Sequence, residues 1–240
     1  MKVRVSAVLA AVLVVVGFAS VSVAQEAPTI DPTRLEAEIQ AFEADDYSMM
    51  PPQGAIVLTG SSSIRRWTSM VADLAPLTVI PRGFGGSAMA DLLHFVDRLV
   101  IQYKPRAVVI YEGDNDTGRY LVPPATIASE LEQIISKIHA SLPQTRVYVM
   151  SVKPSLARVE MWDKAQETNA LYRELVAGND LLTYIDVVTP FLGPDGKVMD
   201  DIFIEDGLHL NEKGTRIWAA TIKAALMAGE AQYESRTNNH

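Results

Sequence analysis

Three consecutive serines, Ser61, Ser62 and Ser63, offer hydroxyl groups that could act as nucleophiles. They follow Gly60 at the end of an apolar run, where a serine could instead cap a following helix, because serine is a favoured N-cap residue. A serine hydroxyl attacks a substrate only when a neighbouring base takes its proton. Nucleophilic chemistry at these serines therefore requires a base from elsewhere in the chain.

His209 is the histidine best placed to act as such a base. Of the four histidines, His94 and His139 fall inside helical patterns and His240 is the last residue. His209 instead lies in a predicted loop, three residues after Asp206. This spacing lets the carboxylate bind one ring nitrogen and leaves the other nitrogen free to accept a proton.

Two further segments could donate hydrogen bonds to a negatively charged oxygen. The first, 82–87, contains three glycines, which allow backbone amides to approach a ligand closely. The second, 111–118, contains Asn115, whose side-chain amide could donate to an oxyanion. An Asx-rich turn without a ligand is the simpler explanation of the second segment.

The glycines also fit another kind of site. Gly83, Gly85 and Ala88 match the G-x-G-x-x-A pattern of dinucleotide-binding loops, and Glu112 could then bind a ribose. These glycines follow the second predicted strand, however, whereas that pattern follows the first strand of its domain. The residues therefore favour an oxyanion site over a nucleotide site.

Metal binding is a further alternative at two places. Asp114, Asp116 and Gly118 match part of a calcium loop, but the later acidic ligands of such a loop are missing. The carboxylates of 200–206 lie near His209, yet no second histidine accompanies them. Neither set of residues completes a familiar ligand pattern, so no metal is expected.

The elements that would position these residues follow from the apolar pattern of the chain. Short runs rich in β-branched residues alternate with amphipathic helical patterns, which predicts a parallel sheet with helices on both faces. Ligands of such sheets bind beyond the carboxyl ends of the strands, where the segments above lie. The predicted strands are 55–59, 77–80, 107–111, 146–150 and 182–187, and the predicted helices are 32–46, 64–74, 88–102, 124–140, 161–177 and 212–228.

Taken in order, these segments resemble the four sequence blocks of the SGNH hydrolases, also called GDSL esterases and lipases. More narrowly, 58–67 and 82–87 resemble a bacterial branch related to the platelet-activating-factor acetylhydrolase catalytic subunits. One departure is Ser61, which stands where the family usually has aspartate. The four blocks are Gly60-Ser61-Ser62, Gly85-Gly86, Gly113-x-Asn115-Asp116 and Asp206-x-x-His209.

The resemblance implies both a fold and a site. The fold is a flavodoxin-like three-layer α/β/α sandwich with a five-stranded parallel sheet in the order 2-1-3-4-5. Ser62 would be the nucleophile, His209 its base and Asp206 the carboxylate that orients the base, with Ser61 and Ser63 as the other candidate nucleophiles. The backbone amides of Ser62 and Gly86 and the side chain of Asn115 would form the oxyanion hole.

The resemblance further implies hydrolysis of small carboxylic esters without a metal or organic cofactor. Short acyl groups, acetyl in particular, are expected because no long apolar lid segment is evident. Acetylated saccharides are one class of ester that fits this expectation. Two alternatives use the same fold: an acyltransferase with the same residues, and a non-catalytic module that binds glycan or lipid. We also expect Met161, Trp162 and Tyr120 to line the substrate site.

The first residues of the chain have the pattern of a signal peptide. Lys2 and Arg4 precede an apolar run that ends in small residues before Gln25. Cleavage after Ala24 and a periplasmic or secreted location are therefore expected, with an uncleaved membrane anchor as the alternative. The chain then divides into a signal peptide (1–24), an N-terminal extension with a helix (25–50), a hydrolase domain (51–230) and a polar tail (231–240).

Composition excludes several classes of partner. The 240 residues carry 21 basic and 29 acidic side chains, a net charge of −8 that opposes binding to nucleic acid. The chain has no cysteine, which excludes disulfides and thiolate metal sites. No segment after the first 24 residues is long and apolar enough to predict stable membrane insertion.

Overall fold

The computed structural model describes residues 29–237, and within them five parallel strands form one sheet. The strand order is β2-β1-β3-β4-β5, which confirms the order predicted from the sequence. Every neighbouring pair of strands is parallel. The strands are β1 Ile56–Gly60, β2 Val79–Gly83, β3 Ala107–Tyr111, β4 Arg146–Met150 and β5 Leu182–Ile185.

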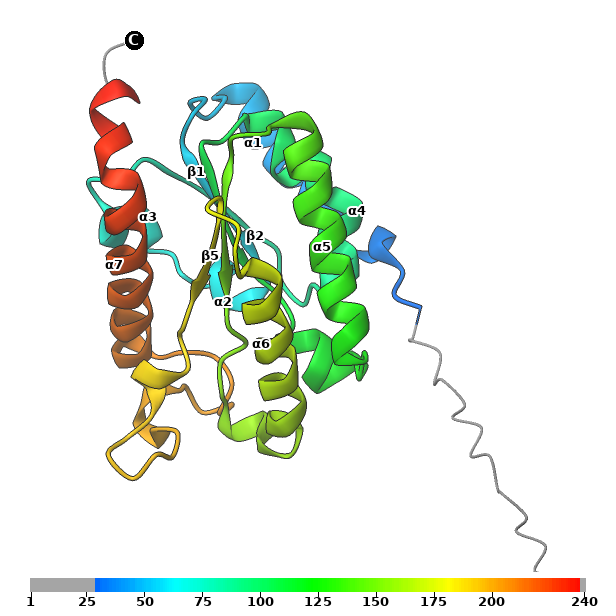
Figure 1. Cartoon of the computed structure of the whole chain (residues 1–240), viewed down its shortest axis with the longest axis vertical. Coiled ribbons are helices and arrows are strands. Elements are labelled where there is room, and N and C mark those ends of the chain that lie inside the picture. The colour runs from blue at the N-terminus through cyan, green and yellow to red at the C-terminus, as the bar shows by residue number, and fades with distance from the viewer. Residues whose placement is uncertain (1–28, 238–240) are drawn as a thin grey trace, which may run out of the picture.

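Helices cover both faces of the sheet and make the predicted three-layer α/β/α sandwich (Figure 1). Helices α3 and α7 lie on one face, and α1, α4, α5 and α6 lie on the other. The helices are α1 Glu36–Ser48, α2 Ser62–Arg65, α3 Met70–Leu74, α4 Met89–Leu99, α5 Pro124–Ser141, α6 Trp162–Val176 and α7 Glu212–Thr237.

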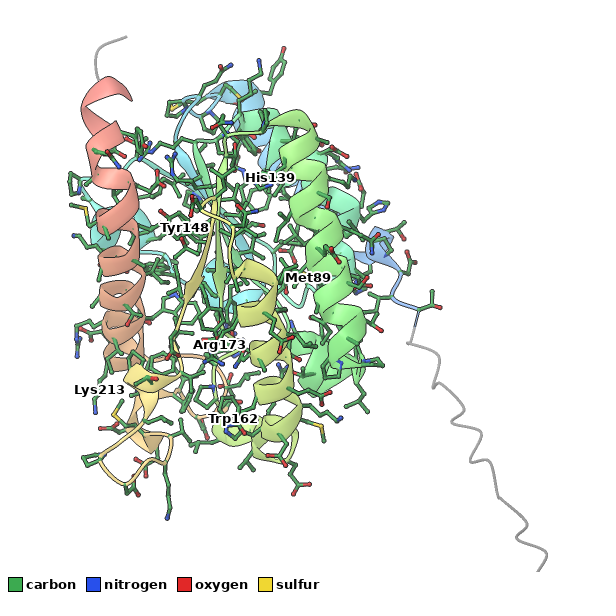
Figure 2. The ribbon with its side chains drawn as sticks, in the orientation of Figure 1. Met89, His139, Tyr148, Trp162, Arg173 and Lys213 are labelled. Carbon is green, nitrogen blue, oxygen red and sulfur yellow. The ribbon has the colours of Figure 1, made fainter. Side chains whose placement is uncertain are left out.

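Strand β1 shows why helices are needed on both faces. All five of its residues are buried, and successive side chains of a strand point to opposite faces. Ile56 and Leu58 accordingly join the core beneath α3 and α7, whereas Val57 joins the core beneath α4 and α5. Figure 2 shows side chains filling both spaces, with Tyr148 on the α7 side of the sheet and Met89 on the α4 side.

The predicted helix over 64–74 is wrong in one respect, because the chain forms two short helices, α2 and α3, instead. Trp67 lies between them and is buried in the core. Its indole nitrogen donates a hydrogen bond of 2.6 Å to Asp73, and Ser69 donates another of 2.6 Å to the same carboxylate. These bonds hold the turn that interrupts the helix.

The predicted end of the last helix near 228 is also wrong, because α7 continues to Thr237. Glu230 is fully buried and forms ion pairs with Arg106 and Arg146. Glu234 is buried one turn later and also pairs with Arg106, which directly precedes β3, so part of the predicted polar tail packs against the sheet. Two buried carboxylates with arginine partners thus extend the helix beyond its apolar pattern.

The segment before β1 is also attached to the domain. Asp31 caps a 3-10 turn, η1 Pro32–Leu35, by accepting a hydrogen bond of 2.9 Å from the amide of Thr33. Asp46 near the end of α1 pairs with Arg82 of β2 at 2.5 Å. The predicted signal peptide, 1–24, lies outside the described residues. None of the helices in 29–237 has the length and apolar character that a membrane crossing requires.

Candidate active site

The site forms where β1, β2 and β3 end side by side. Gly60, the last residue of β1, is in register with Gly83 of β2 and Tyr111 of β3. Its φ of +140° favours glycine, and a side-chain carbon there would collide with the Tyr111 carbonyl. Glycine therefore allows β1 to lie close to β3 and then turn at once into α2, of which Ser62 is the first residue.

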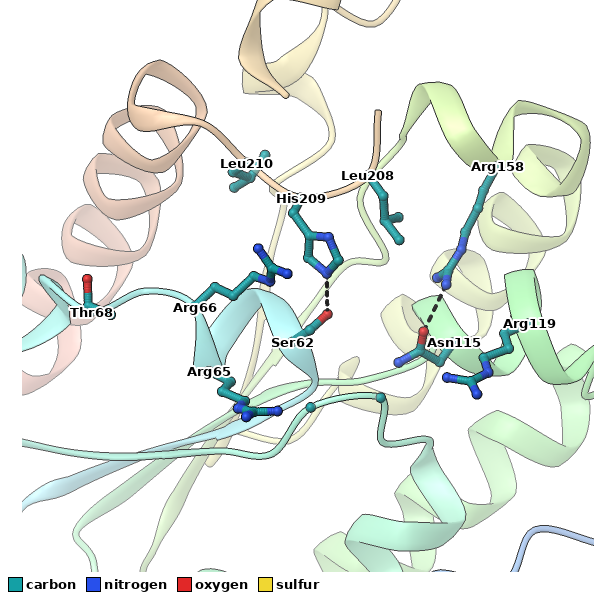
Figure 3. Close-up of a pocket in the computed structure, with 12 residues that line it drawn as sticks. Ser62, Arg65, Arg66, Thr68, Asn115, Arg119, Arg158, Leu208, His209 and Leu210 are labelled. Atoms are coloured by element: carbon teal, nitrogen blue, oxygen red, sulfur yellow. Dashed lines mark hydrogen bonds between the residues drawn. The ribbon is translucent and has the colours of Figure 1, made fainter. Parts of the chain in front are cut away.

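Ser62, His209 and Asp206 form a continuous chain of hydrogen bonds. The distance from Ser62 Oγ to His209 Nε2 is 2.9 Å, as the dashed line between them in Figure 3 marks. The distance from His209 Nδ1 to an Asp206 carboxylate oxygen is 2.6 Å. When Nδ1 carries the proton that binds Asp206, Nε2 is free to accept the Ser62 hydroxyl proton. Ser62 and Asp206, the side chains expected to act together with His209, are thus each within hydrogen-bonding distance of it.

The Asp206 carboxylate is held in place by its own loop. Its other oxygen accepts the backbone amides of Leu208 and His209 at 2.9 Å each. Burial acts in the opposite direction, but the hydrogen bonds from the His209 ring and the two amides lower the pKa of Asp206 to about 2. Asp206 is therefore a carboxylate throughout the neutral and weakly acidic range.

The geometry distinguishes among the three serines. Ser61 is buried and precedes α2, but its side chain makes no capping hydrogen bond to that helix. Ser63 does not line the cavity that contains Ser62, and no hydrogen bond joins it to His209. Among these hydroxyls of the described chain, Ser62 alone both faces that cavity and pairs with the histidine.

Gly86 and Asn115 lie on the same cavity, which has a volume of about 790 Å³. The Asn115 side-chain nitrogen donates to the backbone oxygen of Ser87 at 2.8 Å, and the amide group has a second proton left to donate. Gly86 adopts a φ of +78°, which favours glycine there. The structure therefore brings the predicted residues Ser62, Gly86, Asn115 and His209 to one cavity, and Asp206 joins them through its bond to His209. The lining of the cavity is Ser62, Arg65, Arg66, Thr68, Gly85, Gly86, Asn115, Arg119, Arg158, Leu208, His209 and Leu210.

Four arginines of this lining were not predicted from the sequence. Arg65 and Arg66 follow the serines in and after α2, and Arg119 belongs to a π-helical turn, η3 Asp116–Tyr120, after β3. Arg158 lies in η4 Leu156–Met161, beyond β4. The sequence could have indicated Arg158, because it lies in the segment that follows a predicted strand, and such segments of a parallel sheet reach this edge.

Arg158 fixes the orientation of Asn115. One of its guanidinium nitrogens donates to the Asn115 side-chain oxygen at 2.9 Å, as the dashed line in Figure 3 marks. The other donates to the Asp114 carboxylate at 2.5 Å and to the Asp114 backbone oxygen at 2.6 Å. With its oxygen held by Arg158, the Asn115 amide presents its nitrogen to Ser87 and to the cavity.

Asp114 connects this arrangement to the His209 loop. Burial alone would raise its pKa, but Lys153 and Arg158 keep the pKa of Asp114 below its ordinary value. The ammonium group of Lys153 lies 3.4 Å from Asp114 and donates to the backbone oxygen of Leu208 at 2.8 Å. Both sides of the cavity are thus fastened to one buried carboxylate.

The nucleotide alternative does not fit the positions of its residues. Glu112 is buried and accepts a hydrogen bond of 2.5 Å from the Ser87 hydroxyl, so it does not face the cavity. Burial raises its pKa well above the usual value, which favours a neutral carboxyl group. The Gly85 amide donates to Glu38 of α1 rather than remaining open to a phosphate.

The carboxylates of the calcium alternative are also engaged within the protein. Asp116 accepts backbone amides from Met89 at 2.9 Å and from Gly113 at 3.1 Å. Burial raises the pKa of Asp116 to about 7. Within 29–237, no group of three or more His, Asp or Glu side chains is arranged to hold a metal ion.

The expectation that Met161, Trp162 and Tyr120 line the substrate site is wrong. The Tyr120 hydroxyl donates to the Gly86 backbone oxygen at 3.3 Å and so helps to hold the loop that contains Gly86. Met161 lines a different cavity of about 430 Å³, and Trp162 packs against the core. None of these three side chains lines the cavity that contains Ser62.

The site has the geometry that serine hydrolases use. A serine, a histidine and a carboxylate are linked in series, and amide donors lie beside them at the carboxyl edge of a parallel sheet. Residues 51–217 match the GDSL-like Lipase/Acylhydrolase family, and the chain belongs to this family. This confirms the family expected from the sequence blocks. The chain is accordingly a carboxylic-ester hydrolase by class.

Solved structures share the fold at low sequence identity. A protein from Streptococcus pneumonia named for platelet activating factor is 22% identical, with a TM-score of 0.71, covering 81% of this chain and 94% of its own. A GDSL-like lipase from Bacteroides thetaiotaomicron is 21% identical, with a TM-score of 0.64 and coverage of 80% and 98%. A carbohydrate esterase family 3 protein from Talaromyces cellulolyticus is 16% identical, with a TM-score of 0.59 and coverage of 72% and 97%. No protein with a curated description matches the sequence.

Proposed function

We propose that this chain is an exported serine esterase that hydrolyses short-chain, acetyl-type carboxylic esters. The observation that carries the proposal is the hydrogen-bonded series from Ser62 Oγ through His209 to Asp206. Ser62 is the nucleophile, His209 its general base and Asp206 the group that orients the imidazole and stabilises its charged form. Export rests on the pattern of residues 1–24.

The reaction would proceed in two steps. Ser62 attacks the ester carbonyl while His209 takes the hydroxyl proton, and the proton then passes to the departing alcohol. Water, activated by His209, attacks the acyl-serine and releases the carboxylic acid and the free serine. The backbone amides of Ser62 and Gly86 and the side-chain amide of Asn115 would stabilise the oxyanion in both steps.

In this mechanism Arg158 positions the side chain of Asn115. The Asn115 amide can donate to the oxyanion only if its nitrogen faces the reacting carbonyl. Arg158 binds the Asn115 oxygen at 2.9 Å and thereby disfavours the flipped orientation, because the flip would place an NH₂ group against the guanidinium. The resulting preorganisation of Asn115 is the contribution we assign to Arg158.

The cavity supports short acyl groups and polar alcohols. Four arginines, a threonine and an asparagine make up much of its lining, and the apolar side chains are Leu208 and Leu210. One structure with this fold carries the name carbohydrate esterase family 3, so acetylated saccharides belong among the esters to be tested. An acyltransferase with the same residues would differ in passing the acyl group to an alcohol instead of water.

Hydrolysis of 4-nitrophenyl acetate tests the proposal. We expect the purified protein to release 4-nitrophenol, and the Ser62→Ala and His209→Ala variants to lose at least about 10³-fold in kcat. Ser63→Ala is the matched control and should retain activity, because no hydrogen bond joins Ser63 to His209 in the described residues. Equal activity in the wild type and the Ser62→Ala variant would refute the assignment. Methanol addition followed by product analysis distinguishes transfer from hydrolysis.

A further inference from the structure

Two arginines of the active-site cavity lack a carboxylate partner. Of the eleven arginines between residues 29 and 234, eight form ion pairs with aspartate or glutamate. The three described arginines without such a pair are Arg66, Arg119 and Arg173. Arg66 and Arg119 line the cavity around Ser62, whereas Arg173 stacks on Tyr184 away from it.

The charged side chains that line the cavity are opposite in sign to the net charge of the protein. The protein carries a net charge of −8, yet the twelve residues that line the cavity include four arginines and, among the described residues, no aspartate or glutamate. Arg65 of that lining pairs with Glu38, and Arg158 shares Asp114 with Lys153. Arg66 and Arg119 are therefore the cavity arginines without a carboxylate partner, and both are exposed to solvent.

Arg66 lies on the side of the cavity from which the alcohol would leave. It lines the same small recess as His209, and Figure 3 shows its guanidinium pointing toward that histidine. In the proposed mechanism His209 gives its proton to the departing alcohol, so the alcohol must lie against His209. A negative group on the alcohol would thus be close to Arg66.

Arg119 lies on the other side of Ser62. Figure 3 shows it beside Asn115, and a side-chain carbon added to Gly86 would come within 3.5 Å of its terminal nitrogen. Gly86 and Asn115 are the proposed oxyanion donors, so Arg119 is next to the carbonyl and the acyl part of a bound ester. A negative group on a short acyl chain would be close to Arg119.

We propose that the natural substrate is an anionic ester, with a carboxylate or phosphate group bound by Arg66 on the alcohol side or by Arg119 on the acyl side. This inference rests on the proposed esterase function and specifies its substrate class. A guanidinium offers paired donors that match the geometry of carboxylate and phosphate oxygens. Unpaired guanidinium groups on both sides of the nucleophile therefore favour an anionic ester over a neutral one of the same shape.

Matched pairs of esters test this. On the alcohol side, 4-acetoxybenzoate and 4-acetoxyphenyl phosphate are compared with methyl 4-acetoxybenzoate. On the acyl side, mono(4-nitrophenyl) succinate is compared with 4-nitrophenyl butyrate. We expect the wild type to favour the anionic member of at least one pair by about 10- to 100-fold in kcat/KM. The pair that shows the preference identifies the side, and the phosphate arm identifies the anion.

Three variants assign the preference to the arginines. Arg66→Met should abolish a preference on the alcohol side, and Arg119→Met should abolish one on the acyl side. Arg173→Met is the matched control, because Arg173 also lacks a carboxylate partner among the described residues but lies outside the cavity, and it should leave the ratio unchanged. No preference in the wild type, or a preference that survives in both cavity variants, would overturn the proposal.

A binding measurement separates this inference from the esterase assignment. If the wild type hydrolyses none of the esters, the proposed function has failed and the anion site is judged by inorganic phosphate alone. We expect phosphate to raise the thermal midpoint of the wild type and of Arg173→Met, and to do so much less in the Arg66→Met/Arg119→Met double variant. An equal shift in all three proteins, or no shift in the wild type, would then overturn the anion site.

Discussion

Replacing Arg158 with methionine tests how the active site is positioned. The change removes hydrogen bonds of 2.9 Å to Asn115 and of 2.5 and 2.6 Å to Asp114 while keeping much of the side-chain volume. The Asn115 amide, whose residue is 6% exposed, then loses the partner of its oxygen and keeps the bond from its nitrogen to the Ser87 backbone oxygen. We expect the less restrained amide to present its nitrogen to the cavity for only part of the time.

The magnitude follows from the bonds that are lost. Removal of one oxyanion donor typically lowers kcat by about 10²–10³. Asn115→Ala should reach that range, and Arg158→Met should cost about 10- to 100-fold, because the Asn115 amide remains present and is still held by its bond to Ser87. The free energy of unfolding should fall by about 1–3 kcal/mol, the usual effect of leaving a buried polar group without a partner.

The assay is steady-state hydrolysis of 4-nitrophenyl acetate with kcat and KM determined separately, alongside thermal unfolding. Arg158→Lys can restore an ion pair with Asp114, but its single nitrogen cannot occupy both positions of the guanidinium nitrogens that bind Asp114 and Asn115, so it should recover stability more than kcat. In the Asn115→Ala background, Arg158→Met should cost little further activity, since both changes remove the same interaction. If the two effects multiply instead, or if Arg158→Met retains kcat within twofold, the positioning argument is wrong.

Three further predictions follow from other parts of the structure. Asp206→Asn should lower kcat by about 10³–10⁴ because the imidazole loses its orienting carboxylate. The thermal midpoint should change little, since the Asp206 side chain is 40% exposed. A change of kcat below tenfold would contradict this role. The pKa of Asp116 is raised to about 7, so the folded state holds this proton more tightly than the unfolded state. The contribution of Asp116 to stability is therefore lost as pH rises from about 4 through 7, by up to about 1.4 kcal/mol per pH unit. Denaturant unfolding at pH 5, 6, 7 and 8 should show that the free energy of unfolding declines as pH rises, and that Asp116→Asn makes this decline smaller. An identical decline in the variant would show that other groups cause it. Gly60→Ala should unfold the protein or lower its thermal midpoint severely, because the added carbon would collide with the Tyr111 carbonyl and the residue has a φ of +140°. Thermal unfolding followed by circular dichroism measures this, and an unchanged midpoint would contradict the prediction.

The sequence predicted most of the fold because local patterns specify it. Each strand overlaps a short, mainly apolar run of the sequence, and the segments that follow β1, β2 and β3 meet because parallel strands place their carboxyl ends at one edge. Ser62 and His209 are 147 residues apart, and only the order of the sequence blocks linked them before the structure placed them 2.9 Å apart. That distance is a property of the fold that neither segment encodes alone.

What the sequence did not predict depends on contacts between distant residues. Arg158 binds Asn115 across 43 positions, and no local pattern around either residue indicates that bond. Helix α7 extends past its apolar pattern because Glu230 meets Arg106 and Arg146 from other elements. The break between α2 and α3 likewise depends on how Trp67 is buried against the sheet. Each difference arises from a tertiary interaction that overrides a local preference.

Covalent labelling by a fluorophosphonate, followed by mass spectrometry of the peptides, tests the central claim most directly. Such probes phosphonylate a serine whose proton is taken by a neighbouring base. We predict one adduct in the wild type, located on Ser62, no adduct in Ser62→Ala and strongly reduced labelling in His209→Ala. An adduct on Ser61 or Ser63, or undiminished labelling of Ser62→Ala, would contradict the assignment of Ser62 as the nucleophile.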